Sequence, residues 1–173
     1  MINYLFDWLN YVATDYGTLG QKNYEIVIAN QNHPMPDGEL LVVNLLSVAN
    51  ITRGDHAGID NNGVETVYIQ YEASFSFNFY GENSLNNAIQ LADSMKLDDA
   101  KILLKNQGFT IANSAININN LDVLIGSRFE KRAQFDVLFR GCRELSNTVG
   151  FIETIKGQYV FNGILSNYEV KRN

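Results

Sequence analysis

The chain has 173 residues, 46% of them hydrophobic, which indicates a globular protein with one domain spanning 1–173. Its 13 Lys and Arg residues against 19 Asp and Glu residues give a net charge of −6, which argues against tight binding of nucleic acid through clustered cations. The longest apolar runs, such as 40–43, are far shorter than the roughly 18 residues of a membrane span, and the N-terminus lacks the basic start of a signal peptide.

The first segment has the apolar spacing of one helical face. Its members are Leu5, Trp8, Leu9, Val12 and Tyr16. This spacing predicts a helix, and Gly17 and Gly20 are suited to end it. A β-prone run at 24–29 predicts a strand, and the polar segment 30–38, which holds both prolines of the chain, predicts a turn.

The next segments predict two strands separated by a loop. Residues 40–48 form the first strand, and the Gly-, Asn- and Asp-rich stretch 50–63 forms the loop. In 65–80 apolar residues alternate with polar ones at Val67, Ile69, Tyr71, Ala73, Phe75, Phe77 and Phe79. The alternation predicts a strand with one buried face, and its length predicts either a bulge or an arm that extends beyond the core.

Helical spacing returns after Gly81. The apolar positions of this helix are Leu85, Ala88, Ile89, Ala92 and Met95, with Asn83 or Ser84 as the N-cap. A second helix is predicted over 98–107, after a break near 96–97. Asp98 and Asp99 suit its positive N-terminal end, and Gly108 suits its C-cap.

The rest of the chain predicts strands. Residues 109–118 form one strand and 119–126 a connection, and a second alternation then places one set of residues on a common face: Phe129, Lys131, Ala133, Phe135, Val137 and Phe139. A terminal hairpin is predicted from 151–155 and 159–161, turning at Lys156 and Gly157.

These elements predict an α+β fold: a mostly antiparallel sheet flanked by an N-terminal helix and a central helical pair, in a single domain. Phe75, Phe77, Phe135 and Val137 are expected to share one core.

Residues able to carry chemistry are few and scattered. Cys142 is the only cysteine, which excludes an intramolecular disulfide and a thiolate zinc site, and we expect a buried free thiol. The two histidines, His33 and His56, lie in a predicted turn and a predicted loop. The sequence therefore predicts no catalytic residue, no metal ligand and no cofactor.

Two carboxylates, Glu72 and Glu82, have no evident partner in the sequence. A small hydrolase that uses an unrecognised carboxylate pair is therefore the alternative from a different functional class. Loss of a screened activity on changing either residue would support that alternative.

One region concentrates positive charge. It comprises Arg128, Lys131, Arg132, Arg140 and Arg143. The favoured interpretation is a solvated strand face, balanced by neighbouring acidic residues. The functional interpretation is a charged seam that pairs with an acidic patch on a neighbouring subunit. Its candidate interface residues are Arg128, Glu130, Arg132 and Arg140, and in that case charge reversal at Arg132 weakens assembly more than folding.

Three segments, in this order, resemble the neck or tail terminator proteins of tailed bacteriophages. Residues 26–36 are similar to the family's Asn-Gln-Asn-x-Pro-x-Pro turn after a strand, and 75–81 to a strand that leads into a helix. Residues 129–139 resemble its aromatic-Glu-x-Arg-Ala strand. The resemblance covers about 1–155, and 158–173 match no segment of the family.

The resemblance implies a structural virion protein of the tail or neck, made in the host cytoplasm, and not an enzyme. Such proteins form a homo-oligomeric ring, usually a hexamer, that caps the tail tube and joins it to the head–neck connector. The implied partners are further copies of the chain, the tail tube protein and the connector or adaptor protein. Contact with a sheath protein is left open, no membrane is involved, and DNA only passes through the channel. A head–tail adaptor or tail-completion ring protein is the nearest alternative.

Overall fold

The computed structural model describes residues 2–15, 24–30, 38–113, 115–125, 128–150, 154–161 and 164–171. The chain divides into two compact units. The first consists of Met1–Arg53 and Ile69–Arg143, and the second of Gly54–Tyr68 and Glu144–Asn173.

A mostly antiparallel sheet is the framework of the first unit. Its strands are β1 (Glu25–Ile28), β2 (Leu40–Asn50), β4 (Val64–Tyr80), β5 (Phe109–Ile111), β6 (Asn119–Asn120) and β9 (Arg132–Thr148). The strand order is β1-β2-β4-β9-β5, and β6 pairs with β9. β1 runs parallel to β2, whereas β2 runs antiparallel to β4, and β5 and β6 run antiparallel to β9.

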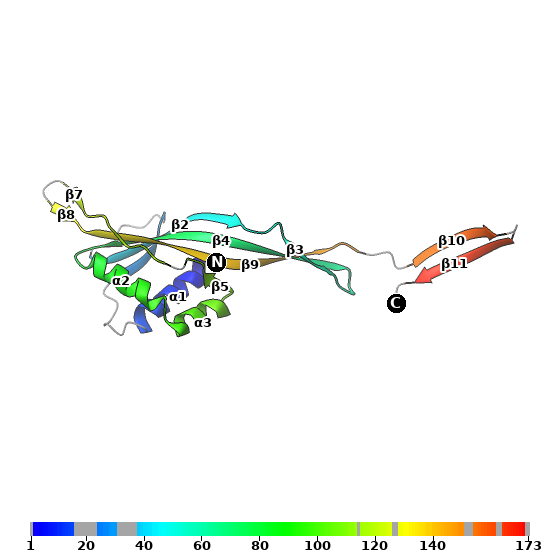
Figure 1. The fold of residues 1–173 in the computed structure, drawn as a ribbon, viewed down its shortest axis with the longest axis horizontal. Coiled ribbons are helices and arrows are strands. Elements are labelled where there is room, and N and C mark those ends of the chain that lie inside the picture. Colours follow the sequence, from blue (N-terminus) through cyan, green and yellow to red (C-terminus); the bar gives the residue numbers. More distant parts are fainter. Residues whose placement is uncertain are drawn as a thin grey trace. The chain divides into compact units, whose positions relative to one another are not determined.

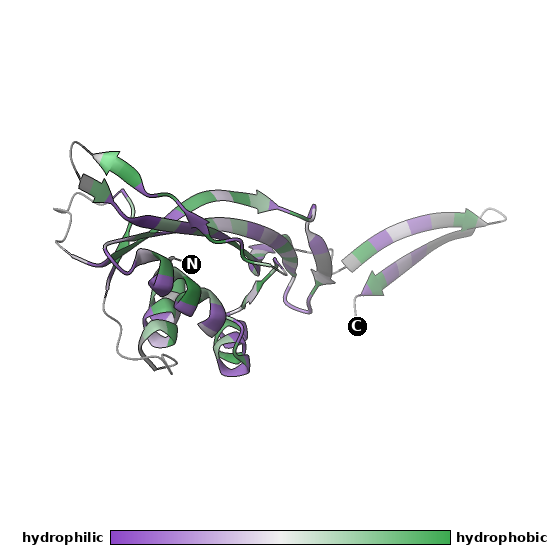
Figure 2. Cartoon of the chain, turned by 60° about the vertical axis from the view of Figure 1, so that its left-hand side comes forward, coloured by the Kyte–Doolittle hydropathy of each residue, from purple (hydrophilic) through white to green (hydrophobic). Residues whose placement is uncertain are grey.

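Three helices lie on the same face of this sheet (Figure 1). They are α1 (Ile2–Asp15), α2 (Ser84–Ser94) and α3 (Asp98–Asn106). Together with the antiparallel pairings, they confirm the predicted α+β fold. Figure 2 shows hydrophobic residues interspersed with hydrophilic ones along the helices and strands, as amphipathic packing requires.

The core forms where the helices meet β4 and β9. Phe75, Phe77, Phe135 and Val137 are all buried, which confirms the predicted shared core. The rings of Phe77 and Phe135 stack with centroids 5.0 Å apart. Trp8 of α1 is also buried, and its indole Nε1 donates a hydrogen bond of 2.8 Å to the carbonyl of Ala100 in α3.

The helical predictions are confirmed in position and partly wrong in orientation. In α1 the predicted face is buried at Leu5, Trp8, Leu9 and Val12, while Tyr16, Gly17 and Gly20 lie outside the described residues. In α2 the predicted core residues Leu85 and Ile89 are exposed, and Leu91 is buried instead. The buried stripe of α2 starts one position earlier, at Ser84, because the buried Asn87 turns inward to donate a hydrogen bond to Glu39.

The long strand prediction over 65–80 is confirmed as β4, but its burial is uneven. The predicted face is buried from Tyr71 to Phe79, whereas Val67 and Ile69 are only half-buried. The predicted bulge is not on β4 itself. The register shifts occur instead in its partners, between Leu45 and Ser47 of β2 and between His56 and Gly58 of β3 (Asp55–Ile59).

The second unit contains a strand that the sequence predicted as loop. β3 pairs antiparallel with the first residues of β4. Asp60 closes the connecting turn, because its Oδ1 accepts hydrogen bonds of 2.8 Å from the backbone amides of Asn62 and Val64. Gly63 completes the turn with a φ of +75°, which favours glycine. The two asparagines and the glycine of this turn are typical loop residues in a sequence, although here they join two paired strands.

Three other strand predictions are wrong. The predicted strand 109–118 is reduced to the three residues of β5, and Phe129 is 67% exposed because it lies on a separate hairpin, β7 (Val123–Ile125) with β8 (Arg128–Glu130). Lys156 and Gly157 are not a turn: they lie inside β10 (Thr154–Phe161), which pairs with β11 (Ile164–Lys171).

Cys142 is exposed rather than buried, because β9 continues beyond the core to Thr148.

We expect Phe77→Ala and Phe135→Ala each to lower the free energy of unfolding by about 3–5 kcal/mol, because each removes a fully buried ring and leaves a cavity. Urea unfolding followed by circular dichroism measures the loss. The control is Ile102→Ala on the exposed face of α3, which is expected to cost less than about 1 kcal/mol. Equal losses for core and control variants would contradict the assigned core.

A second prediction concerns alkaline pH. Burial raises the pKa of Tyr24 from 10.0 to about 12. Above its ordinary pKa the unfolded chain loses this proton first, so the stabilisation is complete below about pH 10 and is lost as pH rises toward 12. Between about pH 9 and pH 11, Tyr24→Phe should therefore lose roughly 1 kcal/mol less unfolding free energy than the natural chain. Parallel pH profiles for the two proteins would show that the tyrosine is not buried in this way.

Candidate subunit interface

The polar side chains of β4 and β9 form a row on the sheet face opposite the helices. They alternate with the core residues of the same strands, so the pleat directs them away from the core. Arg140 Nε donates to Glu72 Oε1 at 2.6 Å, and Arg132 Nη2 donates to Asn78 Oδ1 at 2.6 Å. Between them, Gln134 Nε2 donates to Ser76 Oγ at 3.0 Å. We call these three cross-strand contacts the polar row.

Two cations of this region also lie over aromatic rings. The guanidinium carbon of Arg132 is 5.4 Å from the ring centroid of Tyr80, and that of Arg143 is 5.1 Å from the ring centroid of Tyr71. Burial raises the pKa of Tyr71, and the positive charge of Arg143 partly opposes that rise. Arg143 also donates a hydrogen bond of 2.6 Å to the Asn50 side chain in β2. The cations are thus oriented by their own chain before any partner binds.

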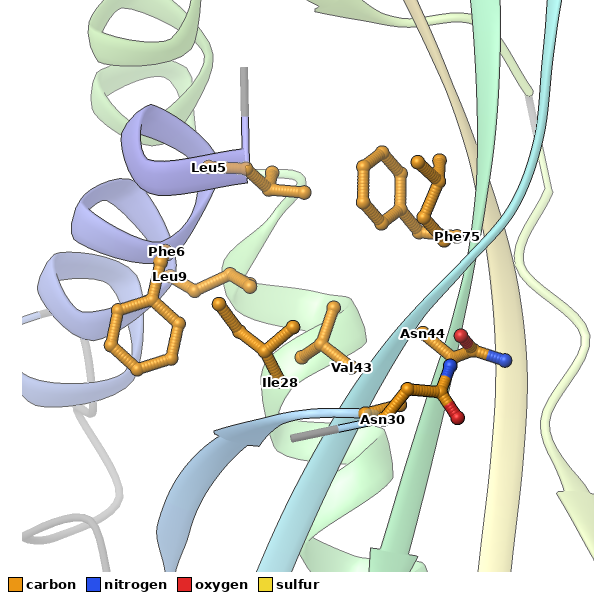
Figure 3. Close-up of a pocket in the computed structure, with 10 residues that line it drawn as sticks. Leu5, Phe6, Leu9, Ile28, Asn30, Val43, Asn44 and Phe75 are labelled. Carbon is orange, nitrogen blue, oxygen red and sulfur yellow. The ribbon is translucent and has the colours of Figure 1, made fainter. Parts of the chain in front are cut away.

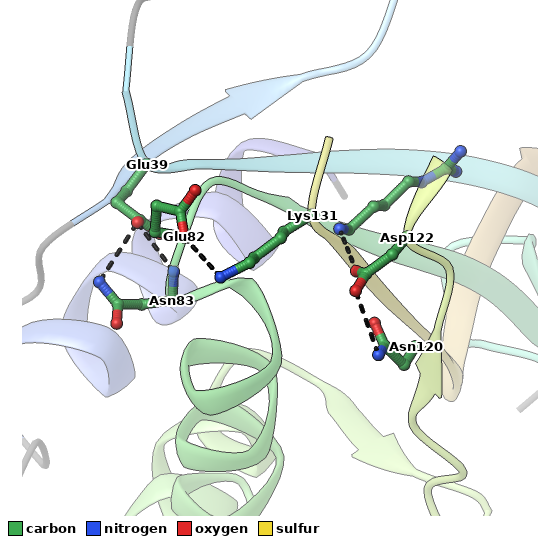
Figure 4. A network of polar contacts seen from close by, with 7 residues as sticks. Glu39, Glu82, Asn83, Asn120, Asp122 and Lys131 are labelled. Carbon is green, nitrogen blue, oxygen red and sulfur yellow. Dashed lines mark hydrogen bonds and ion pairs between the residues drawn. The ribbon is translucent and has the colours of Figure 1, made fainter. Parts of the chain in front are cut away.

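A second polar cluster lies where β4 turns into α2 (Figure 4). The carboxylate of Glu39 accepts hydrogen bonds from the backbone amide of Asn83 at 2.9 Å and from Asn87 Nδ2 at 3.0 Å. Gly81 makes this approach possible, because a Cβ atom there would lie 2.7 Å from the Glu39 carboxyl carbon. The cluster therefore fixes the start of α2 against the beginning of β2.

Lys131 and Asp122 extend this cluster toward the β7–β8 hairpin. Lys131 Nζ forms an ion pair with Glu82, and this hydrogen bond and charge raise the pKa of Lys131. Asp122 Oδ1 accepts a hydrogen bond of 3.1 Å from the backbone amide of Arg132. Figure 4 shows Lys131 and Asp122 on the two sides of the chain as it passes from β8 to β9.

The structure places the four predicted interface residues differently from one another. Arg132 is half-buried in the polar row, Arg140 is exposed at its other end, and Glu130 is exposed on β8. The backbone of Arg128 pairs with Ile125 in the β7–β8 hairpin, and its side chain lies outside the described residues. Of the three whose side chains are described, Arg132 and Arg140 belong to the polar row, and Glu130 lies on a separate hairpin.

Sequence reasoning missed the partners of these charges. Glu72 and Glu82, which had no evident partner in the sequence, form ion pairs with Arg140 and Lys131. The signal for a polar face was present, because Ser76, Asn78 and Gln134 occupy the alternate positions of the two strands. Which side chains meet across the strands depends on register, and the alternation alone does not give the register.

The β7–β8 hairpin exposes apolar side chains beside these charges. Leu124 and Phe129 are cross-strand partners, and both are exposed, as is Val123. Exposed apolar residues grouped in this way are typical of surfaces that bind another protein. Glu130 on the same hairpin adds a charge to that surface.

A pocket of about 180 Å³ lies between α1 and the strands of the first unit (Figure 3). Its lining consists of Leu5, Phe6, Leu9, Ile28, Ala29, Asn30, Val43, Asn44, Leu45 and Phe75. Apolar side chains dominate, and none of the ten residues is charged. The pocket thus suits an apolar group and offers no acid, base or nucleophile for catalysis.

Within the described ranges, no three His, Cys, Asp or Glu residues are grouped so that they could hold a metal ion. None of the helices in this part of the chain is both long and apolar enough to cross a membrane. His33 lies outside the described residues, as does the side chain of His56.

The chain matches a known protein family. A family model described as phage neck terminator protein matches residues 2–164. A search of curated proteins finds no match. The matched range includes all of the polar row, the cluster around Glu39 and the β7–β8 hairpin.

The Glu39 cluster gives a prediction for folding. Glu39→Ala should lower the free energy of unfolding by about 1–3 kcal/mol, because it leaves the Asn83 amide and the Asn87 side chain without an acceptor. Glu82→Ala is the matched control, since it removes a carboxylate of the same cluster whose side chain is 79% exposed. It should cost less than about 1 kcal/mol. Urea unfolding measures both losses, and a larger cost for Glu82 would overturn the structural role assigned to Glu39.

Proposed function

The chain belongs to the phage neck terminator family and is therefore a structural protein of the phage neck, and we propose that it forms a ring that caps the tail tube. The ring joins the tube to the head–neck connector and leaves a channel for the genome. We propose that it is a homo-oligomer, a hexamer in the form usual for such rings, and that it is made in the host cytoplasm before it enters the virion. Each chain contributes one domain in this proposal.

The family match over 2–164 is the observation that carries this proposal. The exposed apolar side chains of the β7–β8 hairpin support it, because covering them with another protein removes apolar surface from water and so favours association. A ring requires two different complementary patches on each subunit, since its contacts are heterologous. We propose that the hairpin belongs to one of these patches.

Arg128, Glu130, Arg132 and Arg140 remain our proposed charged interface residues. An arginine has five N–H donors, and the contacts in the polar row use only part of them. Arg140 donates through Nε to Glu72, and Arg132 donates through Nη2 to Asn78. Both guanidinium groups therefore retain donors for carboxylates of a neighbouring subunit.

The net charge of −6 fits a channel through which DNA moves. A basic surface would bind phosphates through counterion release and would slow passage of the genome, whereas an acidic subunit repels the backbone. We therefore propose the tail tube protein and the connector or adaptor protein as partners, with DNA present only in transit. A sheath protein is a further candidate partner in a contractile tail.

The first test is the mass of the purified protein by light scattering on a sizing column. A ring of six subunits has six times the chain mass of 19.5 kDa. Addition of tail tubes should give end-bound rings and should stop tube growth. Binding to a portal ring instead of tail tubes would overturn the terminator role in favour of a head–tail adaptor.

Charge reversal tests the proposed interface. Glu130→Lys changes an exposed charge on β8, so it should raise the dissociation constant of the ring by about tenfold with little change in unfolding free energy. Arg132→Glu should weaken assembly as well, and should also destabilise the fold through loss of the Asn78 contact. The matched control is Lys105→Glu on the exposed side of α3. Equal ring formation by all variants would indicate that these charges lie on a solvated strand face and not at a subunit interface.

A further inference from the structure

The C-terminal hairpin forms a two-stranded sheet of its own. β10 and β11 pair antiparallel along their whole length, from Thr154 opposite Lys171 to Phe161 opposite Ile164. No other strand in the described part of the chain pairs with either of them. An isolated two-stranded hairpin is at best marginally stable in water, so its surroundings decide whether it persists.

The hairpin has one apolar face. Ile155 lies opposite Val170, and Gly157 lies opposite Tyr168, so these residues share a side of the pleat. The exposed fractions of Ile155, Tyr168 and Val170 are 50%, 46% and 58%. Figure 2 shows hydrophobic residues near the two ends of β10 and more hydrophilic residues between them.

The opposite face is polar from Lys156 to Gln158, and nearer the turn it holds Val160, which is 66% exposed and lies opposite Leu165. Lys156 lies opposite Glu169 with 3.8 Å between Nζ and Oε2, and Lys171 is 3.4 Å from the other oxygen of the same carboxylate. Gln158 and Asn167 form the next exposed cross-strand pair. Water therefore suits the polar part of this face, whereas the apolar face remains uncovered.

Gly157 shapes the apolar face. The ring of Tyr168 lies directly over it, since a Cβ atom at this position would be 2.5 Å from the ring. The absence of a side chain lets the ring lie flat against β10, and the outer side of the ring stays open to a partner. An aromatic ring placed over a glycine in this way also supports the pairing of the two strands.

We propose that a second copy of this chain covers the apolar face of the hairpin; this inference rests on the proposed ring. Charge favours that partner. Residues 154–171 contain two lysines and one glutamate and so carry a net charge of +1. Since the whole chain has a net charge of −6, the rest of it carries −7. The hairpin is thus attracted to the acidic remainder of another subunit.

The first unit of the second copy offers an acceptor for the hairpin. β1 pairs with β2 only as far as Val43, and no described strand pairs with the outer edge of β2 beyond it. Leu46 and Val48 in this part of β2 are 51% and 46% exposed. An open strand edge with exposed apolar side chains is a surface to which another chain can add a strand.

The β10–β11 hairpin as donor and the edge of β2 as acceptor are two different patches, as a ring of identical subunits requires. The hairpin belongs to the second unit and the acceptor to the first, so each copy carries both. The hairpin then deepens the proposed function by naming the segment that holds neighbouring subunits together.

The first experiment compares charge insertion on the two faces of the hairpin in the full chain. Val170→Lys and Ile155→Lys place a charge on the apolar face, and each should raise the dissociation constant of the ring by about tenfold or more. Gln158→Lys places the same charge on the polar face and should leave assembly unchanged. Sedimentation equilibrium measures all three, with and without tail tubes. Equal assembly by all variants overturns the proposal.

The second experiment identifies the acceptor by crosslinking. Cys142 is exposed, so every variant carries Cys142→Ser. Chains with Val48→Cys are mixed with chains with Val170→Cys and treated with a short bismaleimide, which should give a crosslinked dimer. Replacing Val170→Cys by Gln158→Cys should reduce the yield at least about fivefold, because that side chain lies on the polar face.

A double variant, Val48→Cys with Val170→Cys in one chain, tests whether the hairpin binds the first unit of its own chain instead of that of a second copy. A crosslink within single chains at high dilution means that the hairpin folds onto its own first unit, and this overturns the proposal. Rings that form without any crosslink also overturn it but leave the proposed function intact. Absence of self-association, both alone and with tail tubes, overturns the inference and the ring together.

Discussion

The contact between β4 and β9 is the constraint on which the first unit depends. Phe77 stacks on Phe135, and Phe75 meets the edge of Phe139 on the same pair of strands. These rings form the apolar surface against which α1, α2 and α3 pack, because the apolar sides of both strands face the helices. Once the two strands are in register, the alternate positions must meet on the other side of the sheet. The polar row is thus a consequence of the same pairing that builds the core.

This coupling determines which parts could be predicted from the sequence. The period of two in β4 and the helical spacing in α1 depend on local burial, so both elements and most of their core residues followed from the sequence. The partners of Glu72 and Glu82 did not, since they lie 68 and 49 residues away in the chain. β3 was missed because its five residues include a glycine and two polar side chains, and only pairing with β4 makes them a strand. The orientation of α2 also depended on a distant residue, Glu39.

The candidate interface shows the same limit more strongly. The cations were visible in the sequence, but whether each is committed to its own chain depends on contacts between strands. Arg140 and Lys131 prove to be paired within the chain, whereas the apolar residues beside Glu130 are uncovered. The family match supplies what the charges alone do not, namely that this surface belongs to a protein of the phage neck. Assembly surfaces of this kind carry no chemical motif, so sequence patterns identify them less readily than catalytic residues.

The chain passes between its two units at three points, and two of them lie inside strands. β4 crosses from Tyr68 to Ile69, and β9 crosses from Arg143 to Glu144, while the third crossing lies in the loop between Arg53 and Gly54. A single cut in that loop would therefore leave the two units joined through β4 and β9, because residues 54–173 remain one uninterrupted backbone. Equally, no simple truncation yields either unit intact, since removal of one shortens both long strands of the other. The two units thus have compact contacts of their own but share the two long strands.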